Sequence, residues 1–231
     1  AFCESHTHYG SLLYLSGLSK RLNDAQKKLV EIFSQNVQIA FDNIMLTKDI
    51  EDTQREIIER LGQAMEVGVG TENYTLRTVK VCHILGQALG FDEEQLRLLT
   101  SAVPLHDIGN LYVPTHALFS ADAPSAKDID LIAKHTRFGY RLLKDSQRPL
   151  IKIAATIAKE HYEHWDGKGY PNGLCAENIH LYARIASVAI AYNVLRCQSK
   201  HAEAWPVPKV MSRLKELSGS QFDPSLIALL T

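Results

Sequence analysis

A long stretch of helical periodicity constrains this fold more than any other feature of the chain. From Lys20 to Glu66, apolar residues recur at the three- and four-residue spacing of an α-helix. An unbroken helix of that length would extend on the order of 65 Å, which is more than a compact domain can cover. Part of its apolar face therefore needs a partner helix, and we expect a parallel homodimer. The alternative is a bend at the polar stretch 47–55 that lets the helix pack back on its own domain.

The remainder of the chain is also predicted to be helical. The run 11–18 suits a short strand but has too few partners for a sheet, and no β alternation follows Gly70. Asp92 with Gln95 forms a capping-box pattern that marks a helix start. Helices are expected at 74–90, 92–104, 128–146, 149–164, 180–197, 206–218 and 224–231. The predicted fold class is all-α, a helical bundle preceded by a long helix and a short β remnant.

Composition limits the partners of the chain. Its 231 residues carry a net charge of −1, so no global field attracts nucleic acid or an anionic lipid surface. The apolar runs are much shorter than the roughly 20 residues that cross a membrane, and the first residues lack a signal pattern. The four cysteines show no CxxC spacing, so no zinc knuckle is indicated. We expect neither nucleic acid nor membrane as a partner, and a cytoplasmic location.

Two polar segments stand out against this helical background. His106 and Asp107 are adjacent in SAVPLHDIGNLYVP, and residues 161–171 read HYEHWDGKGYP. An adjacent imidazole and carboxylate allow the histidine to bind one metal ion while the carboxylate bridges two. The glycines and the proline of the second segment define a fixed loop, because glycine permits positive φ and proline locks the exit. An HD pair alone is more often a core or capping pair than a metal site.

The two segments together resemble the HD-GYP family, a branch of the HD phosphohydrolases. LHDIGN is similar to the family's LHDIGK, and the later segments GLCAENIHLYARI and QFDPSLIALL are also similar to family motifs. The resemblance covers about residues 55–231 and implies an HD-domain bundle. The family's usual activity is metal-dependent hydrolysis of the bacterial second messenger cyclic di-GMP. The resemblance also implies four metal ligands: His106, Asp107, His135 and His161. Of these, it implies Asp107 as the residual catalytic residue.

The beginning of the chain resembles the end of a sensor-like domain that precedes HD-GYP domains in some two-component response regulators. We therefore expect a remnant of that domain at 1–19, a connecting and dimerisation helix at 20–66, and an HD-GYP domain at 67–231.

Four positions that carry metal ligands in the family hold other residues here. Matching without gaps places them at Thr71, Thr75, Tyr162 and Ile190. Three ligands remain for one ion, which is enough for an open site with a bound water. Two-metal hydrolysis needs a second ion roughly 3.5–4 Å away. The resemblance therefore implies no metal or a single divalent ion such as iron, manganese or zinc, and two ions are not expected.

The cations that hold the ligand phosphates in the family are also replaced. Their positions correspond to Asn110, Ser199 and Ala202. Each lost cation removes a charge-assisted hydrogen bond worth roughly 1.5–3 kcal/mol, so binding of cyclic di-GMP should be weak or absent. Lys168 and Arg184 could compensate only if the fold aimed them at the cleft.

The sequence thus predicts a degenerate HD-GYP module, impaired or inactive as a phosphodiesterase, that acts through protein contacts. In the family, the GYP loop is associated with docking to GGDEF-type domains, which synthesise cyclic di-GMP. Two alternatives stay open. One is an active phosphodiesterase with a reduced metal site, in which His164 lies on the helical face of His161 and replaces the ligand lost at Tyr162. The other is a sensor that binds cyclic di-GMP without cleaving it. The GYP loop is intact here: Asp166, Gly167, Lys168, Gly169, Tyr170 and Pro171.

Overall fold

The structure is a computed structural model that describes residues 2–3, 11–12, 21–65, 73–119, 125–197 and 203–230. The chain divides into two compact units, Ala1–Glu56 and Ile57–Thr231. Among the helices of the described ranges, none has a stretch both long and apolar enough to cross a membrane.

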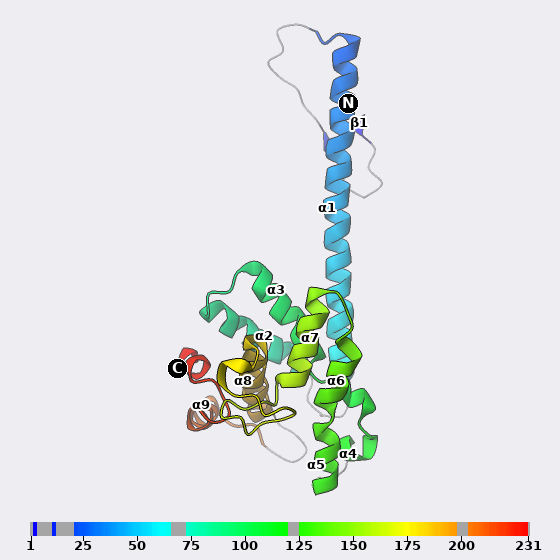
Figure 1. The fold of residues 1–231 in the computed structure, drawn as a ribbon. Coiled ribbons are helices and arrows are strands. Elements are labelled where there is room, and N and C mark those ends of the chain that lie inside the picture. The colour runs from blue at the N-terminus through cyan, green and yellow to red at the C-terminus, as the bar shows by residue number, and fades with distance from the viewer. Residues whose placement is uncertain are drawn as a thin grey trace. The chain divides into compact units, whose positions relative to one another are not determined.

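A single long helix, α1 (Asp24–Met65), follows two short strands (Figure 1). It begins with reciprocal hydrogen bonds between Asn23 and Gln26, at 2.9 and 3.0 Å. It is continuous through residues 47–55, so the predicted alternative of a bend there is wrong. Strands β1 (Phe2–Cys3) and β2 (Ser11–Leu12) pair antiparallel. The predicted strand 11–18 is thus observed only at its beginning, and residues 13–18 lie outside the described part.

The second unit consists of short helices, which confirms the all-α prediction. The predicted capping box of Asp92 and Gln95 is present at the start of one of them. Ile57–Thr231 contains α2 (Tyr74–Ala88), α3 (Glu93–Ala102), η2 (Val103–Leu105), η3 (Ile108–Tyr112), α4 (Thr115–Phe119), α5 (Ala126–Ala133), α6 (His135–Leu143), α7 (Pro149–Glu160), η4 (Ala176–Asn178), α8 (Leu181–Arg196), α9 (Val207–Glu216) and α10 (Pro224–Leu229).

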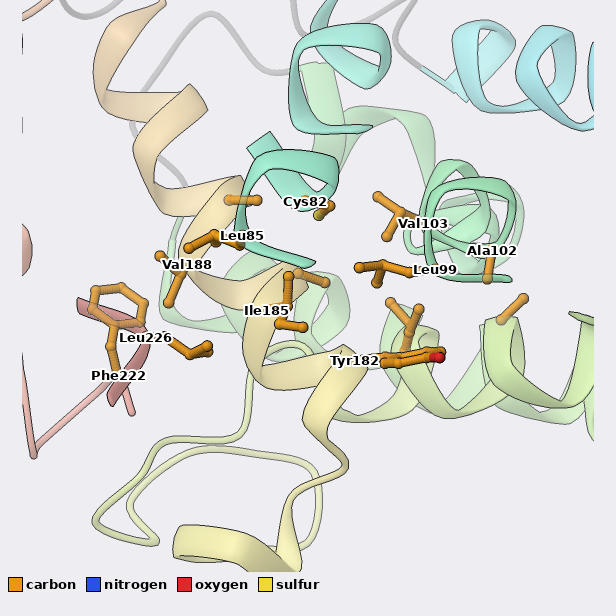
Figure 2. Packing of buried hydrophobic residues seen from close by; sticks show 14 of the residues in the cluster. Cys82, Leu85, Leu99, Ala102, Val103, Tyr182, Ile185, Val188, Phe222 and Leu226 are labelled. Atoms are coloured by element: carbon orange, nitrogen blue, oxygen red, sulfur yellow. The ribbon is translucent and has the colours of Figure 1, made fainter. Parts of the chain in front are cut away.

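Helix α8 lies at the centre of the hydrophobic core. Its sequence LYARIASVAIAYNVLR is apolar on almost every side, which is typical of a helix enclosed by others. Figure 2 shows Ile185 and Val188 of α8 between Leu85 of α2 and Leu226 of α10. Leu99 of α3 is also fully buried in this cluster. The core therefore fixes α8 against α2, α7, α9 and α10.

The predicted helix 128–146 is wrong, because two helices separated at Lys134 occupy this range. The side chains of His135 and Thr136 bond to carbonyls of the last turn of α5, at 2.6 and 3.0 Å. Side chains that occupy backbone carbonyls in this way compete with continuous helix. The break places His135 at the first position of α6.

The predicted helix 149–164 ends four residues early, at Glu160. Beyond it, His161 N and Glu163 N still bond to the last turn of α7, and other backbone groups bond to loops. Trp165 N donates to Gln221 O at 3.1 Å, and Tyr162 O accepts from Tyr170 N at 3.1 Å. Residues 161–164 therefore form a turn that leads into the GYP loop.

Candidate metal centre

The HD turn and the ends of two helices bring a carboxylate and two imidazoles together. Asp107 follows η2, His135 opens α6, and His161 caps α7. One ligand atom from each lies within 4.8 Å of those of the other two. The close approach depends on Gly109, since a Cβ there would overlap the carbonyl oxygen of His135 and come within 2.6 Å of Gly139 N. Glycine in the HDIG segment thus lets η3 lie directly against α6.

Backbone carbonyls fix the protonation of three imidazoles around Asp107. A carbonyl oxygen only accepts hydrogen bonds, so each bonded Nδ1 must carry the hydrogen and each Nε2 of a neutral ring presents a lone pair. These Nε2 atoms approach Asp107 at 3.4 Å from His106, 3.4 Å from His135 and 3.6 Å from His161. The Nδ1–carbonyl distances are 2.9 Å for His106 to Val103, 2.6 Å for His135 to Ile132 and 2.9 Å for His161 to Ile157.

Two contacts in this cluster require a shared positive charge. Nε2 of His135 lies 3.3 Å from Nε2 of His161, which would oppose two lone pairs if both rings were neutral. Nε2 of His106 is buried and makes no hydrogen bond, although it approaches Asp107. A proton on one ring relieves the first contact. A divalent cation would satisfy the converging donors together, so the residues fit a metal ion.

The electrostatics of the cluster support an ionised carboxylate. Burial opposes ionisation of Asp107, but the charge of His106 and the neighbouring imidazoles of His135 and His161 hold the pKa of its carboxyl well below the usual range. Burial works to lower the pKa of His135, and the hydrogen bond to Asp107 raises it above its ordinary value. Burial lowers the pKa of His161 to about 4, so this ring is neutral at physiological pH.

Two tyrosines close one side of the cluster. The ring of Tyr162 packs against His161 and His135, with centroid distances of 4.7 and 5.4 Å. It stacks on Tyr170 of the GYP loop at 4.9 Å with an interplanar angle of 14°. Burial and the nearby Asp107 charge raise the pKa of Tyr162, so its phenol stays neutral. Tyr162 therefore supplies a neutral aromatic wall where the family resemblance implies a ligand.

The α2 and α8 side of the cluster offers hydrocarbon and aromatic groups. The ring of Tyr74 lies 6.2 Å from that of His106. Tyr74 therefore borders the cluster. Thr75, the position that ungapped matching gave, is also buried in α2, and its methyl group lies close to Gly62. On α8, Ile190 packs against the hydrophobic core.

Other predicted site residues are not at the cluster. Within the described ranges, the group of metal-competent side chains consists of Asp107, His135 and His161, so His164 does not replace a ligand. Arg184 binds Asp223 at 2.6 Å, and Lys168 lies on the exposed side of the GYP loop. Asn110 is in η3, where its backbone donates to Asp107 O. Three predicted positions lie outside the described residues: Thr71, Ser199 and Ala202.

A buried glutamate anchors the GYP loop, and sequence analysis did not single it out. Glu163 is 2% exposed and its carboxylate accepts hydrogen bonds from Asn172 N at 2.7 Å and Leu174 N at 2.9 Å. A Cβ at Gly169 would overlap the backbone of residues 162–164, so only glycine permits this approach. Arg137 donates to Pro171 O at 3.0 Å. The loop is thus fixed to α6 and to the turn after α7.

The helical bundle and the HD cluster define an HD-type metal-binding domain. Residues 49–226 match the family described as HD domain, and the chain belongs to that family. Residues 1–50 match a second family, described as a domain of unknown function, DUF3369.

Curated relatives share this region and carry phosphodiesterase names. The chain is 31% identical over 221 residues to the 3'3'-cGAMP-specific phosphodiesterase 2 of Vibrio cholerae, covering 95% of this chain and 42% of the relative. It is 34% identical over 180 residues to the cyclic di-GMP phosphodiesterase response regulator RpfG of Xanthomonas campestris, covering 78% and 48%. The chain therefore spans less than half the length of these two relatives. They confirm the resemblance to HD-GYP proteins.

Solved structures show the same fold. Bd1817, an HD-GYP protein of Bdellovibrio bacteriovorus, matches with a TM-score of 0.56 and 23% identity over 78% of this chain and 60% of that one. A cyclic GMP-AMP specific phosphodiesterase of V. cholerae matches with a TM-score of 0.53 and 20% identity over 76% and 47%.

Proposed function

We propose that this chain is an HD-GYP signalling module of a cyclic-dinucleotide system that holds one divalent metal ion and is impaired as a phosphodiesterase. One observation carries the proposal: Asp107, His135 and His161 converge, while Tyr74 lies beside His106 and Ile190 lines the cavity next to His161. The relatives are named as phosphodiesterases of cyclic dinucleotides, which supports the assignment to a cyclic-dinucleotide system.

The metal ligands that are present determine which steps of phosphodiester hydrolysis the site could support. A divalent ion supplies Lewis acidity, which lowers the pKa of a bound water and polarises a phosphoryl oxygen. Asp107, His135 and His161 would hold that ion, with their Nδ1–H bonds keeping the rings in orientation. The hydrocarbon of Ile190 cannot hold the second ion that shares the phosphoryl charge in two-metal hydrolysis. Hydrolysis should therefore be slow.

The cavity beside the cluster also suits a dianionic ligand poorly. It has a volume of about 260 Å³ and its wall includes Ile190, Val194 and Leu217. Its lining contains one cationic side chain, Arg213, which is paired with Glu216 at 3.0 Å. A dinucleotide with two phosphates would gain few charge-assisted hydrogen bonds from the described lining. This chemistry supports weak or absent binding of cyclic di-GMP.

We further propose that the GYP loop (residues 166–171) is the contact surface for a protein partner, of which a GGDEF-type domain is the expected kind. Two features support this assignment. Hydrogen bonds to Glu163 and from Arg137 already fix the loop, so little conformational entropy would be lost when a partner binds it. The side chain of Lys168 is 82% exposed, and its ion pair with Asp166 at 3.2 Å lies where a partner could contact it.

Metal content and turnover test the proposal together. The purified chain, reconstituted anaerobically with excess iron or manganese and desalted, should hold one equivalent, measured by elemental analysis. Hydrolysis of cyclic di-GMP and of 3'3'-cGAMP should be at least about 100-fold slower than by an HD-GYP relative with both metal sites. Two equivalents with matching turnover would establish the active enzyme instead. Turnover with one equivalent, lost in Asp107→Asn, would favour the reduced-site phosphodiesterase.

A further inference from the structure

Helix α1 (Asp24–Met65; Figure 1) exposes apolar side chains on several faces. Five of them follow one line along the helix: Leu29, Ile32, Ile39, Leu46 and Ile50. The exposed fractions range from 47% for Ile32 to 68% for Leu29. The polar side chains of Ser34 and Gln38, on another face, are only 8% and 7% exposed. In the described structure, α1 thus buries polar side chains and exposes leucine and isoleucine side chains. This distribution indicates that a partner packs against the exposed apolar side chains.

The exposed line follows a seven-residue repeat. With Leu29 at position a, position a also contains Asn36, Asn43 and Ile50, and position d contains Ile32, Ile39, Leu46 and Thr53. We call these eight residues the seam. All eight are exposed. Five of the eight are apolar, and asparagine at position a is compatible with a two-stranded coiled coil.

From this pattern we infer that the seam pairs with the seam of a second copy of this chain as a parallel, in-register coiled coil, and that Asn36 and Asn43 set the register. In register, each asparagine faces its own copy and the two amides can hydrogen-bond. A shift of one heptad would place Asn43 against Ile50 and leave a buried amide without a partner.

The charges beside the seam are compatible with the parallel orientation. Position g holds Lys28, Gln35, Asp42, Asp49 and Glu56, and position e holds Phe33, Ala40, Thr47 and Gln54. In a parallel pair, position g of one helix faces position e of the other, so each charged side chain meets an uncharged one. The inference rests on α1 alone and is independent of the proposed function.

A matched pair of double substitutions tests the seam on the full 231-residue chain. Sedimentation equilibrium between 1 and about 100 µM should show a dimer. Ile39→Glu with Leu46→Glu should raise the dimer dissociation constant at least about 100-fold, because four carboxylates would enter the apolar interface. Phe41→Glu with Ile44→Glu, at off-seam residues of similar exposure (59% and 64%), should leave the dimer intact. Circular dichroism checks that both variants remain helical.

A monomeric parent chain, or equal dissociation of both variants, would overturn the inference. Orientation is tested with Asn43→Cys under mild oxidation, followed by peptide mapping. A disulfide between the two copies of the substituted position is expected, and its absence in a dimeric protein contradicts the parallel register. Asn36→Leu with Asn43→Leu should produce larger or mixed oligomers, since the polar pair no longer selects two strands. An unchanged dimer would refute the role assigned to the asparagines.

Discussion

The two sides of the HD turn have the same backbone support but different chemistry. On the α6 and α7 side, His135 and His161 present oriented Nε2 atoms to Asp107. On the α2 and α8 side, Tyr74 and Ile190 pack as a buried ring and a core aliphatic group. The helices are held by the same core, so the two sides can differ in chemistry within one fold. Under the proposed function, this core would keep the fold intact even if only one side binds metal.

The largest effect should come from the carboxylate common to all three imidazoles. Asp107→Asn removes the anionic ligand, and the dissociation constant for manganese should rise at least 100-fold, equivalent to about 2.7 kcal/mol. Isothermal titration calorimetry on the metal-free chain measures it. Asp166→Asn, an amide replacement on the GYP loop, should leave the constant unchanged. Equal metal binding by parent and Asp107→Asn would show that the ion does not sit on the HD turn.

Restoring ligands on the poorer side sharpens the comparison. Ile190→Asp with Tyr74→His should raise the metal content from one to two equivalents. Without metal, a carboxylate beside the core should destabilise the fold by about 1–3 kcal/mol, and excess manganese should recover the loss. Thermal unfolding with and without manganese measures both. Ile190→Asn with Tyr74→His is the control. If manganese stabilised this control against thermal unfolding by the same amount, the introduced carboxylate would not be the metal ligand.

Metal affinity should depend on pH through His135. Its pKa is raised above the ordinary value, so below that pKa the metal must displace a proton. Affinity should therefore increase up to about tenfold per pH unit as the pH rises toward this pKa, and then level off. His161, with a pKa near 4, has already lost its proton and adds nothing above pH 5. Calorimetry in buffers of different ionisation enthalpy counts the released proton, and release of none at pH 6 would contradict this account.

The smallest effect is expected where the GYP loop is anchored. Glu163→Gln leaves one oxygen to accept from Asn172 N and Leu174 N, so one buried N–H loses its partner at a cost of about 1 kcal/mol. Hydrogen exchange at residues 169–174 should accelerate while metal affinity stays constant. Glu177→Gln, at an exposed site, provides the comparison. Unchanged exchange in Glu163→Gln would mean that other contacts hold the loop.

Sequence reasoning reached the helical class because periodicity reports burial, and the long helix 20–66 is close to the observed Asp24–Met65. It joined α5 and α6 because their apolar pattern is continuous. The break arises from side-chain bonds of His135 and Thr136, which periodicity does not register. Asp107, His135 and His161 followed from family motifs, whereas sequence analysis singled out neither Tyr74 nor Glu163. Both residues are placed by tertiary contacts, which helical periodicity does not predict: Tyr74 packs near His106, and Glu163 binds the loop at 172–174.

The anomalous difference map of a crystal soaked in manganese tests the central claim most directly. One peak bound by Asp107, His135 and His161 is predicted, with Tyr74 and Ile190 making no contact to it. Two peaks within about 4 Å of each other, bridged by Asp107, would contradict the single-metal account.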